Sequence, residues 1–187
     1  MKNTSDKKEE RLMIFIDGSN FYYSTAKKGT RIDFQKLIKE LVGERKLINA
    51  FYYVAPLDIS EDAGKYWKHQ KFLDMLKSIQ KFKVVLCTLK KIKTANGSFI
   101  YLVKGDDVHL SHDLLMGAVD NLYDTAIIVS GDEDFMPIIK TIRERYKKKV
   151  ENAYFSKSSS YNLRRACDSS IHLNKLLSKI IENQKEH

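Results

Sequence analysis

Residues 125–137, with the sequence TAIIVSGDEDFMP, decide the fold of this chain. The run 125–129 is short, apolar and rich in Ile and Val, and Ser130-Gly131 ends it with a turn signal, which predicts a buried strand. Acidic residues follow at once, namely Asp132, Glu133 and Asp134. Acids at the carboxyl end of a buried strand lie where open α/β sheets place their ligand sites. A simpler interpretation stays open, in which Asp132 only caps the helix that follows.

A second apolar run, residues 12–16 (LMIFI), also ends in a carboxylate. The residues that follow are Asp17, Gly18, Ser19 and Asn20. Glycine permits a tight turn at this point, and Ser19 or Asn20 can cap a helix. Two buried strands are therefore predicted to present an acid at their carboxyl ends.

The rest of the chain alternates strands with helices. Asp33 and Gly43 fit the two caps of a helix with an apolar stripe, and Asn96-Gly97 between two β-prone runs predicts a hairpin. The expected strands are 47–55, 83–89, 99–103, 149–155 and 169–173, and the expected helices are 62–80, 106–122, 134–147 and 158–166. This alternation predicts a three-layer α/β/α sandwich with a mostly parallel central sheet. Trp67, within the helix at 62–80, has basic neighbours and could stack on a base, but a half-buried packing residue is the favoured interpretation.

Length and composition fit one domain with short tails. The 187 residues allow one domain of roughly 150 residues. We expect a disordered tail at 1–10, the domain at 11–175 and a helical tail at 176–187. The net charge of +9 fits an anionic partner such as nucleic acid, although a basic surface without a partner would give the same charge.

Several classes of protein are disfavoured. The two cysteines, Cys87 and Cys167, have no CxxC spacing, so neither a disulfide framework nor a zinc site is expected. Residues 1–11 are charged and contain no apolar segment of the signal-peptide type, and no run approaches 18 apolar residues. We therefore expect no membrane partner and a cytoplasmic location.

Acids recur at predicted strand ends and helix starts. The candidates are Asp17, Asp106, Asp107, Asp113, Asp132 and Asp134. Asp106 and Asp113 are seven residues apart, which places them on one face of a helix about two turns apart. Clustered carboxylates repel one another, and Mg²⁺ prefers oxygen ligands from one or two carboxylates, water and substrate phosphate. The pattern therefore favours a divalent metal site, with Asn20 as a neutral polar group beside it.

Common catalytic motifs are absent from the sequence. It contains no GxxxxGK[ST], no GxGxxG after a strand, no GxSxG and no HExxH. The segment DGSN carries an acid after a strand, as in aspartyl-phosphate enzymes, but Ser19 stands where that class has a second acid.

Three segments in combination resemble one family. The sequences IFIDGSN (14–20), KGDDVHLSHDLL (104–115) and IIVSGDEDFMPII (127–139) resemble the NYN domain family, a PIN-like group that includes LabA-like proteins. The resemblance extends from about residue 12 to residue 173. It implies a Rossmann-like α/β/α sandwich with a parallel sheet, an acidic pocket that binds Mg²⁺ or Mn²⁺, and ribonuclease activity.

The same resemblance implies roles for individual residues. The acidic pocket of the family matches Asp17, Asp107, Asp132 and Asp134, with Asn20 beside it, Lys104 before the helix acid and Asp113 as a further acid. Asp106 stands where the family often has an apolar or small residue. Helix spacing pairs Asp106 with Asp113, whereas the motif points to Asp107, so the metal-facing acid stays open.

The leading hypothesis is a metal-dependent ribonuclease that acts on single-stranded or structured RNA. Asn20 and Ser130 are expected substrate contacts, together with basic residues near the pocket (Lys90, Lys91, Lys93 and Lys104) and a second patch at Arg164 and Arg165. Each of these basic residues taken singly fits an ordinary solvated charge.

Other hypotheses stay open. A catalytically silent RNA-binding or regulatory module with the same fold is the main alternative, and a phosphatase acting on small phosphate esters is a third. A homodimer is compatible with the sequence, which does not specify the oligomeric state.

Overall fold

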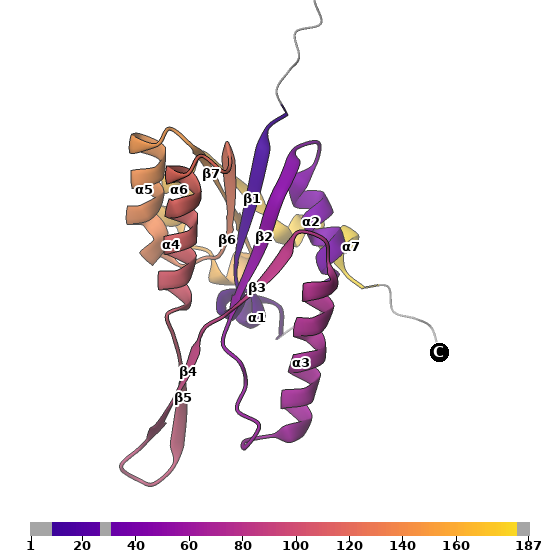
Figure 1. Cartoon of the computed structure of the whole chain (residues 1–187), viewed down its shortest axis with the longest axis vertical. Coiled ribbons are helices and arrows are strands. Elements are labelled where there is room, and N and C mark those ends of the chain that lie inside the picture. Colours follow the sequence, from indigo (N-terminus) through magenta and orange to yellow (C-terminus); the bar gives the residue numbers. More distant parts are fainter. Residues whose placement is uncertain (1–8, 27–30, 183–187) are drawn as a thin grey trace, which may run out of the picture.

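A fully parallel six-stranded sheet forms the centre of the molecule (Figure 1). The structure is a computed structural model that describes residues 9–26 and 31–182, so most of the predicted tail at 1–10 lies outside the described residues. The strand order is β3-β2-β1-β6-β7-β8. The strands are β1 (Arg11–Asp17), β2 (Lys46–Val54), β3 (Phe82–Leu86), β6 (Thr125–Val129), β7 (Lys149–Tyr154) and β8 (Ser169–His172). The predicted α/β sandwich with a mostly parallel sheet is confirmed.

Alternation along β1 divides the core into two layers. Leu12, Ile14 and Ile16 belong to one apolar cluster, whereas Met13 and Phe15 belong to the cluster on the opposite face of the sheet. Successive side chains of a strand point to opposite faces, so Asp17 is directed to the same face as Met13 and Phe15. A strand buried on both faces explains why the sequence at 12–16 is continuously apolar.

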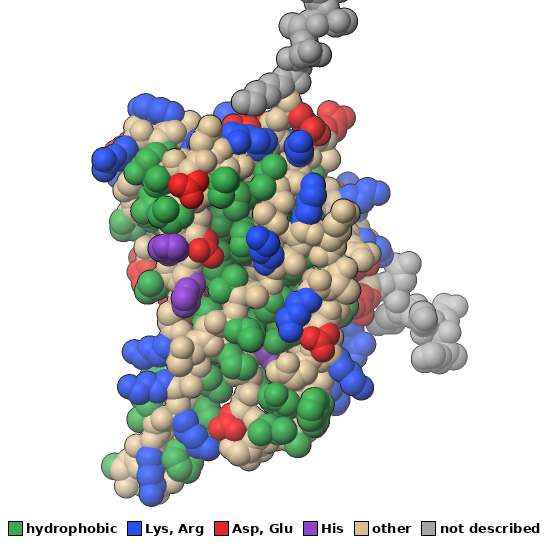
Figure 2. Space-filling view, viewed as in Figure 1, with side chains coloured by type: hydrophobic (Ala, Val, Ile, Leu, Met, Phe, Trp, Pro, Cys, Tyr) green, Lys and Arg blue, Asp and Glu red, His purple; other side chains and the backbone are tan. Residues whose placement is uncertain are grey.

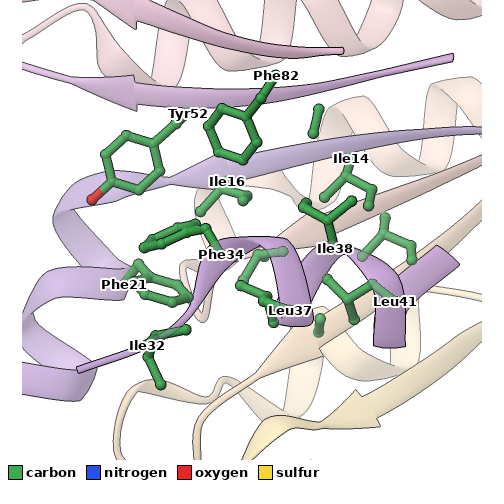
Figure 3. Packing of buried hydrophobic residues seen from close by; sticks show 14 of the residues in the cluster. Ile14, Ile16, Phe21, Ile32, Phe34, Leu37, Ile38, Leu41, Tyr52 and Phe82 are labelled. Carbon is green, nitrogen blue, oxygen red and sulfur yellow. The ribbon is translucent and has the colours of Figure 1, made fainter. Parts of the chain in front are cut away.

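Four helices cover the face that carries Leu12, Ile14 and Ile16. They are α1 (Gly18–Ala26), α2 (Phe34–Val42), α3 (Ala63–Ser78) and α7 (Leu177–Ile180). The α2 stripe of Phe34, Leu37, Ile38 and Leu41 packs into this cluster (Figure 3). The Asp33 carboxylate accepts a hydrogen bond of 3.0 Å from the Lys36 backbone amide and caps α2 as predicted. Ile180 is fully buried against this layer, so α7 is part of the domain.

Three further helices cover the other face. They are α4 (Asp106–Val119), α5 (Met136–Arg145) and α6 (Tyr161–Ala166). The helix predicted at 134–147 begins instead as a 3-10 turn, η1 (Glu133–Phe135), because the Asp132 carboxylate caps that turn by accepting from the Asp134 amide. The helix predicted at 158–166 is divided into the 3-10 turn η2 (Ser156–Ser158) and α6, since the Ser160 hydroxyl caps the later start. Among the described residues, no helix is long and apolar enough to cross a membrane.

A two-stranded hairpin projects from the carboxyl end of the sheet (Figure 1). The strand predicted at 83–89 ends at Leu86, and the chain continues through Cys87 into β4 (Thr88–Lys93), which pairs antiparallel with β5 (Phe99–Lys104). Gly97 has φ +85° in the turn, which confirms the hairpin predicted from Asn96-Gly97. The last residue of β5, Lys104, leads through Gly105 directly into α4.

An ion pair joins the starts of the two central strands. Asp124 accepts hydrogen bonds from the Arg11 backbone amide (2.9 Å) and from two nitrogens of its guanidinium (3.1 and 2.7 Å). These bonds with Arg11 hold the pKa of Asp124 well below its usual range. Since β1 and β6 come from distant parts of the chain, the pair fixes their relative register at the amino edge of the sheet.

Replacing this carboxylate should destabilise the fold. Asp124→Asn removes the charge that pairs with Arg11, and we expect a loss of about 1–2 kcal/mol in the free energy of unfolding, because the pair is partly exposed. The pKa of Asp124 is lowered by folding, so its contribution is present above the unfolded-state pKa and is lost as the pH falls below about 4. Urea denaturation at neutral and acid pH measures both effects. The matched variant Asp120→Asn, at the exposed end of α4, should change little at either pH, and equal effects of the two variants would contradict the assignment.

Candidate metal and nucleic-acid site

The candidate site lies where the strand order reverses. From β1 the chain proceeds to β2 on one side of the sheet, whereas β6 lies on the other side of β1 and leads on to β7. Loops that leave β1 and β6 therefore diverge and open a crevice at the carboxyl ends of these strands. Asp17 is the last residue of β1, and Ser130 directly follows β6.

Asp17 is a buried carboxylate with specific partners. Its side chain accepts hydrogen bonds from the Asn20 backbone amide at 2.9 Å and from the Ser130 hydroxyl at 2.8 Å, and the residue is only 5% exposed. Burial raises the pKa of Asp17, the two hydrogen bonds lower it, and the nearby charges of Asp106 and Asp132 raise it further. The fold thus holds an acid where its negative charge is poorly solvated.

The turn after β6 is held by hydrogen bonds and by a close contact between two backbone segments. The Asn20 side-chain oxygen accepts from the Gly131 amide at 3.2 Å, and the Gly131 carbonyl accepts from the Ser160 amide at 3.2 Å. A Cβ atom at Gly131 would lie 1.2 Å from the Ser158 carbonyl oxygen, so no larger residue fits there. The close contact of Gly131 with the loop at Ser158, which is remote in sequence, therefore explains the glycine of the Ser130-Gly131 pair.

The start of α4 supplies two acids. Gly105 has φ +86°, and this left-handed turn directs the chain from the hairpin into the helix. The Ser19 hydroxyl donates to the Asp106 carboxylate at 3.2 Å, a contact that the sequence reading did not foresee. Burial raises the pKa of Asp107 to about 6, and the charges of Asp106, Asp17, Asp132 and Asp134 add to the rise. The Ser19 hydrogen bond thus links Asp106 to α1. Asp107, the next residue, is more exposed than Asp106.

Asp113 lies apart from these acids. Its carboxylate accepts a hydrogen bond of 3.0 Å from the Tyr53 hydroxyl and lies 3.1 Å from His112 Nδ1. The neighbouring charges that raise the pKa values of Asp17 and Asp107 do not include Asp113. Asp106 and Asp113 share one face of α4, as their spacing predicts. Two helical turns separate their side chains along that face.

The turn after β6 adds two more acids. The Asp132 amide donates to the Ser130 hydroxyl at 3.1 Å, and the Asp132 side chain caps η1. Asp132 therefore caps a 3-10 turn that leads into α5, and the same residue also adds its charge beside Asp17 and Asp107. Glu133 points elsewhere, because Ser160 and Asn162 both donate to its carboxylate. We call the remaining set, Asp17, Asp106, Asp107, Asp132 and Asp134, the acidic pocket.

The acidic pocket suits a hard divalent cation by the chemistry of its donors. Its carboxylate oxygens are ligands that Mg²⁺ and Mn²⁺ prefer, and burial, together with the charges of neighbouring carboxylates, raises the pKa of Asp107. Within residues 9–26 and 31–182, no three side chains of the His, Cys, Asp and Glu types converge tightly enough to enclose an ion by themselves. A Mg²⁺ site needs only one or two carboxylates when water and substrate phosphate supply the other ligands.

The candidate basic residues lie in three different environments. Lys91 is engaged within the protein, since its amine lies 3.4 Å from Asp58 and over the rings of Phe99 and Tyr101. The other lysines, Lys90, Lys93 and Lys104, are exposed on the hairpin. The guanidinium of Arg164 lies over Tyr154 and Tyr161, and that of Arg165 lies over Tyr161.

Adding a methyl group at Gly131 should disrupt this site. Gly131→Ala forces the turn away from Ser158, and we expect a loss of roughly 3 kcal/mol or more in unfolding free energy, as for other severe steric conflicts. Gly97→Ala is a matched control, because that glycine has φ +85° but open space around it, so it should lose only about 1–2 kcal/mol. Chemical denaturation of both variants compares them directly. A Gly131 variant as stable as the Gly97 variant would show that the loop at Ser158 is not rigid.

Comparison with known proteins places this geometry in a family. The NYN domain model matches residues 11–174. The chain is 29% identical over 138 residues to Low amplitude and bright protein LabA of Synechococcus elongatus, a match that covers 72% of this chain and 69% of that protein. It is also similar to a crystal structure of a protein of unknown function from Vibrio parahaemolyticus, with a TM-score of 0.73, 25% identity, and 97% of this chain and all of that chain covered. The chain therefore belongs to the NYN domain family, whose members are PIN-like nucleases.

Proposed function

We propose that this protein is a metal-dependent ribonuclease that cleaves phosphodiester bonds at the acidic pocket. The observation that carries the proposal is the arrangement of carboxylates from β1, α4 and the β6 turn around one buried acid, Asp17, at the switch point of the sheet. A bound Mg²⁺ or Mn²⁺ would activate water and neutralise charge on the phosphoryl oxygens. Membership of a family of PIN-like nucleases supports the same activity.

Individual residues have different roles in the proposed reaction. Asp17, Asp107, Asp132 and Asp134 are the proposed metal-holding acids, and Asp106 is a further candidate because it lies against Ser19 beside Asp17. Ser130 and Asn20 fix the Asp17 carboxylate and the β6 turn, so they position the acids as well as line the crevice. Asp113 is a weaker candidate, since Tyr53 already satisfies one of its oxygens.

The hairpin is the proposed approach path for the RNA backbone. Figure 2 shows blue Lys and Arg side chains along the projecting hairpin at the lower end of the molecule. Lys90 and Lys93 are exposed there, and Lys104 stands at the base of the hairpin, two residues before Asp106. Positive charges in this place offset the repulsion between the acidic pocket and a phosphate chain. Lys91 contributes less, because it already pairs with Asp58.

A catalytically silent RNA-binding module is the second candidate. The specific observation in its favour is that no three acidic or histidine side chains of the described residues converge on one point. Under this alternative, the hairpin would bind RNA while the pocket held an ion without turnover. Metal binding and cleavage must therefore be measured separately.

Divalent metal should stabilise the fold in a pH-dependent way. A ligand that binds only the folded state adds roughly 2.7 kcal/mol at about 100 times its dissociation constant. Without metal, folding raises the pKa of Asp107 to about 6. The contribution of Asp107 to the free energy of unfolding is therefore complete at acid pH and is lost as the pH rises from about 4 to 6. Metal requires the deprotonated acid, so Mn²⁺ affinity should increase over the same interval.

Thermal melts in Mn²⁺ at pH 5 and pH 7.5 test this, with K⁺ at equal ionic strength as the control. Identical melting curves with and without Mn²⁺ at pH 7.5 would refute a metal pocket.

Neutral replacements in the pocket should separate cleavage from binding. Asp17→Asn and Asp132→Asn keep the shape of the side chain but remove the charge that a cation needs, so each should abolish Mn²⁺-dependent cleavage of single-stranded RNA. RNA binding in EDTA should persist or become tighter, because the pocket then repels phosphate less. Asp120→Asn is the matched acid outside the pocket, at the exposed end of α4, and should retain cleavage. Comparison of Asp106→Asn with Asp107→Asn identifies which acid of α4 matters more.

The decisive control is the unmodified protein in Mn²⁺ and then in EDTA. Cleavage that requires Mn²⁺ and is lost in Asp17→Asn supports the ribonuclease. If the protein binds several RNA sequences and structures yet leaves all of them intact in Mn²⁺, the silent binding module is the correct function.

A further inference from the structure

Three exposed tyrosines lie on α1 and α6, two helices that contact the acidic pocket or the turn after β6 through Ser19 and Ser160. Tyr22 and Tyr23 on α1 are 63% and 72% exposed, and Tyr161 at the start of α6 is 62% exposed. Their rings contribute little to the apolar core, in contrast to Phe21, which is 4% exposed and packs against Phe34. Large aromatic side chains left in solvent around one crevice indicate a surface that a ligand covers.

The helix α1 directs its two tyrosines to the pocket side. Tyr22 and Tyr23 follow Ser19 by three and four positions, and residues at these spacings share one face of a helix. Ser19 itself contacts Asp106, so this face borders the acidic pocket. Helical side chains also tilt toward the N-terminus of their helix, which for α1 is the end that carries Asp17 and Gly18. The two rings lie 5.8 Å apart in an edge-to-face arrangement.

Tyr161 lies at the start of α6, next to Ser160, which contacts the turn after β6. Its two neighbours, Ser160 and Asn162, both donate to the carboxylate of Glu133, which holds the start of α6 against the acidic turn. Arg164 lies 5.8 Å and Arg165 lies 5.7 Å from the centre of the Tyr161 ring. This ring therefore carries two permanent positive charges beside it, a combination suited to a base and its adjoining phosphates.

One loop joins the two sides into a continuous surface. The hydroxyls of Ser24 on α1 and Ser158 in η2 share a hydrogen bond of 2.6 Å, and the Ser160 amide donates to the Gly131 carbonyl. The steric contact between Gly131 and Ser158 further restricts this loop. The tyrosines of α1 and the start of α6 are thus held on a fixed frame around the β6 turn.

We infer that Tyr22, Tyr23 and Tyr161 form a stacking platform for unpaired bases beside the acidic pocket. This inference rests on the proposed function. The aromatic rings need the open face of a base, and only unstacked nucleotides offer it, whereas an A-form duplex presents phosphates and 2′-hydroxyl groups. Stacking tolerates any base, so the platform selects strand state rather than sequence.

Binding in EDTA tests the platform without reference to cleavage. The probe is a short fluorescein-labelled single-stranded RNA, with an RNA duplex and an abasic phosphate chain of equal length as competitors. The protein should prefer the single strand to both competitors, and the triple variant Tyr22→Ala, Tyr23→Ala, Tyr161→Ala should bind the single strand at least about tenfold more weakly. A 2-aminopurine base in the strand should be quenched on binding to the unmodified protein and should remain bright with the triple variant.

Two control proteins distinguish stacking from other effects. The triple Tyr→Phe variant keeps all three rings and should bind as the unmodified protein does. Leu122→Ala removes a 46% exposed apolar side chain just before β6, at the opposite edge of the sheet, and should also leave binding unchanged. Melting temperatures of all variants should match, because the replaced side chains are exposed.

The outcomes separate the platform from the nuclease activity. If the triple alanine variant binds the single strand as tightly as the unmodified protein, or if the duplex competes equally well, the platform does not exist, even where Mn²⁺-dependent cleavage is present. If the alanine variant loses binding and quenching while no protein cleaves RNA in Mn²⁺, the platform stands and the ribonuclease proposal fails.

Discussion

A buried carboxylate at the end of the central strand is the constraint on which the site depends. Asp17 loses most of its hydration inside the sheet, and hydrogen bonds from the Asn20 amide and the Ser130 hydroxyl replace it. Loss of hydration is costly for a charged group unless such partners hold it. The turn after β1 must therefore bring Asn20 back toward Asp17, and the turn after β6 must bring Ser130 across.

The contacts that hold Asp17 in place also involve elements that carry none of the pocket acids. Asn20 also accepts from Gly131, and Gly131 approaches Ser158 so closely that a side chain is excluded. Ser158 in turn bonds to Ser24 on α1, which returns the chain of contacts to the helix that follows Asp17. The contacts form a closed ring around the switch point, so a change at one member is expected to displace the others.

Much of the fold was predictable because it depends on local pattern. Continuous apolar runs at 12–16 and 125–129 predict strands buried on both faces, and the structure places them side by side in the sheet. The Asp33 cap, the Gly43 end and the Asn96-Gly97 turn are local signals that the structure confirms. The predicted alternation of strands and helices was sufficient for the sandwich, since helices must cover both faces of a parallel sheet.

Predictions failed where distant parts of the chain decide the outcome. Trp67 was expected to be half-buried, but it is 58% exposed, because the apolar stripe of α3 packs through Leu73 and Leu76 instead. Spacing places Asp113 on the same face of the helix as Asp106, but it gives no indication that the Tyr53 hydroxyl of β2 donates to the Asp113 carboxylate. Lys91 looked equivalent to Lys90 and Lys93, but its amine pairs with Asp58, in the segment between β2 and α3. For Asp113 and Lys91 the deciding partner lies on another part of the chain, 60 and 33 residues away.

Charge distribution explains how a basic protein can carry an acidic site. The chain has a net charge of +9, but five of its acids gather around one crevice, where they raise the pKa values of Asp17 and Asp107. A phosphate chain is attracted by the surrounding field and repelled at the pocket itself, so contact at the pocket depends on a cation that reverses the local sign. In the proposed function, lysines on the hairpin and arginines on α6 would bring RNA to the crevice, whereas only the acidic pocket would determine whether it is cleaved. Binding and turnover would then respond to different residues, because the basic groups lie on the hairpin and α6, whereas the acids lie at the end of β1, the start of α4 and the turn after β6.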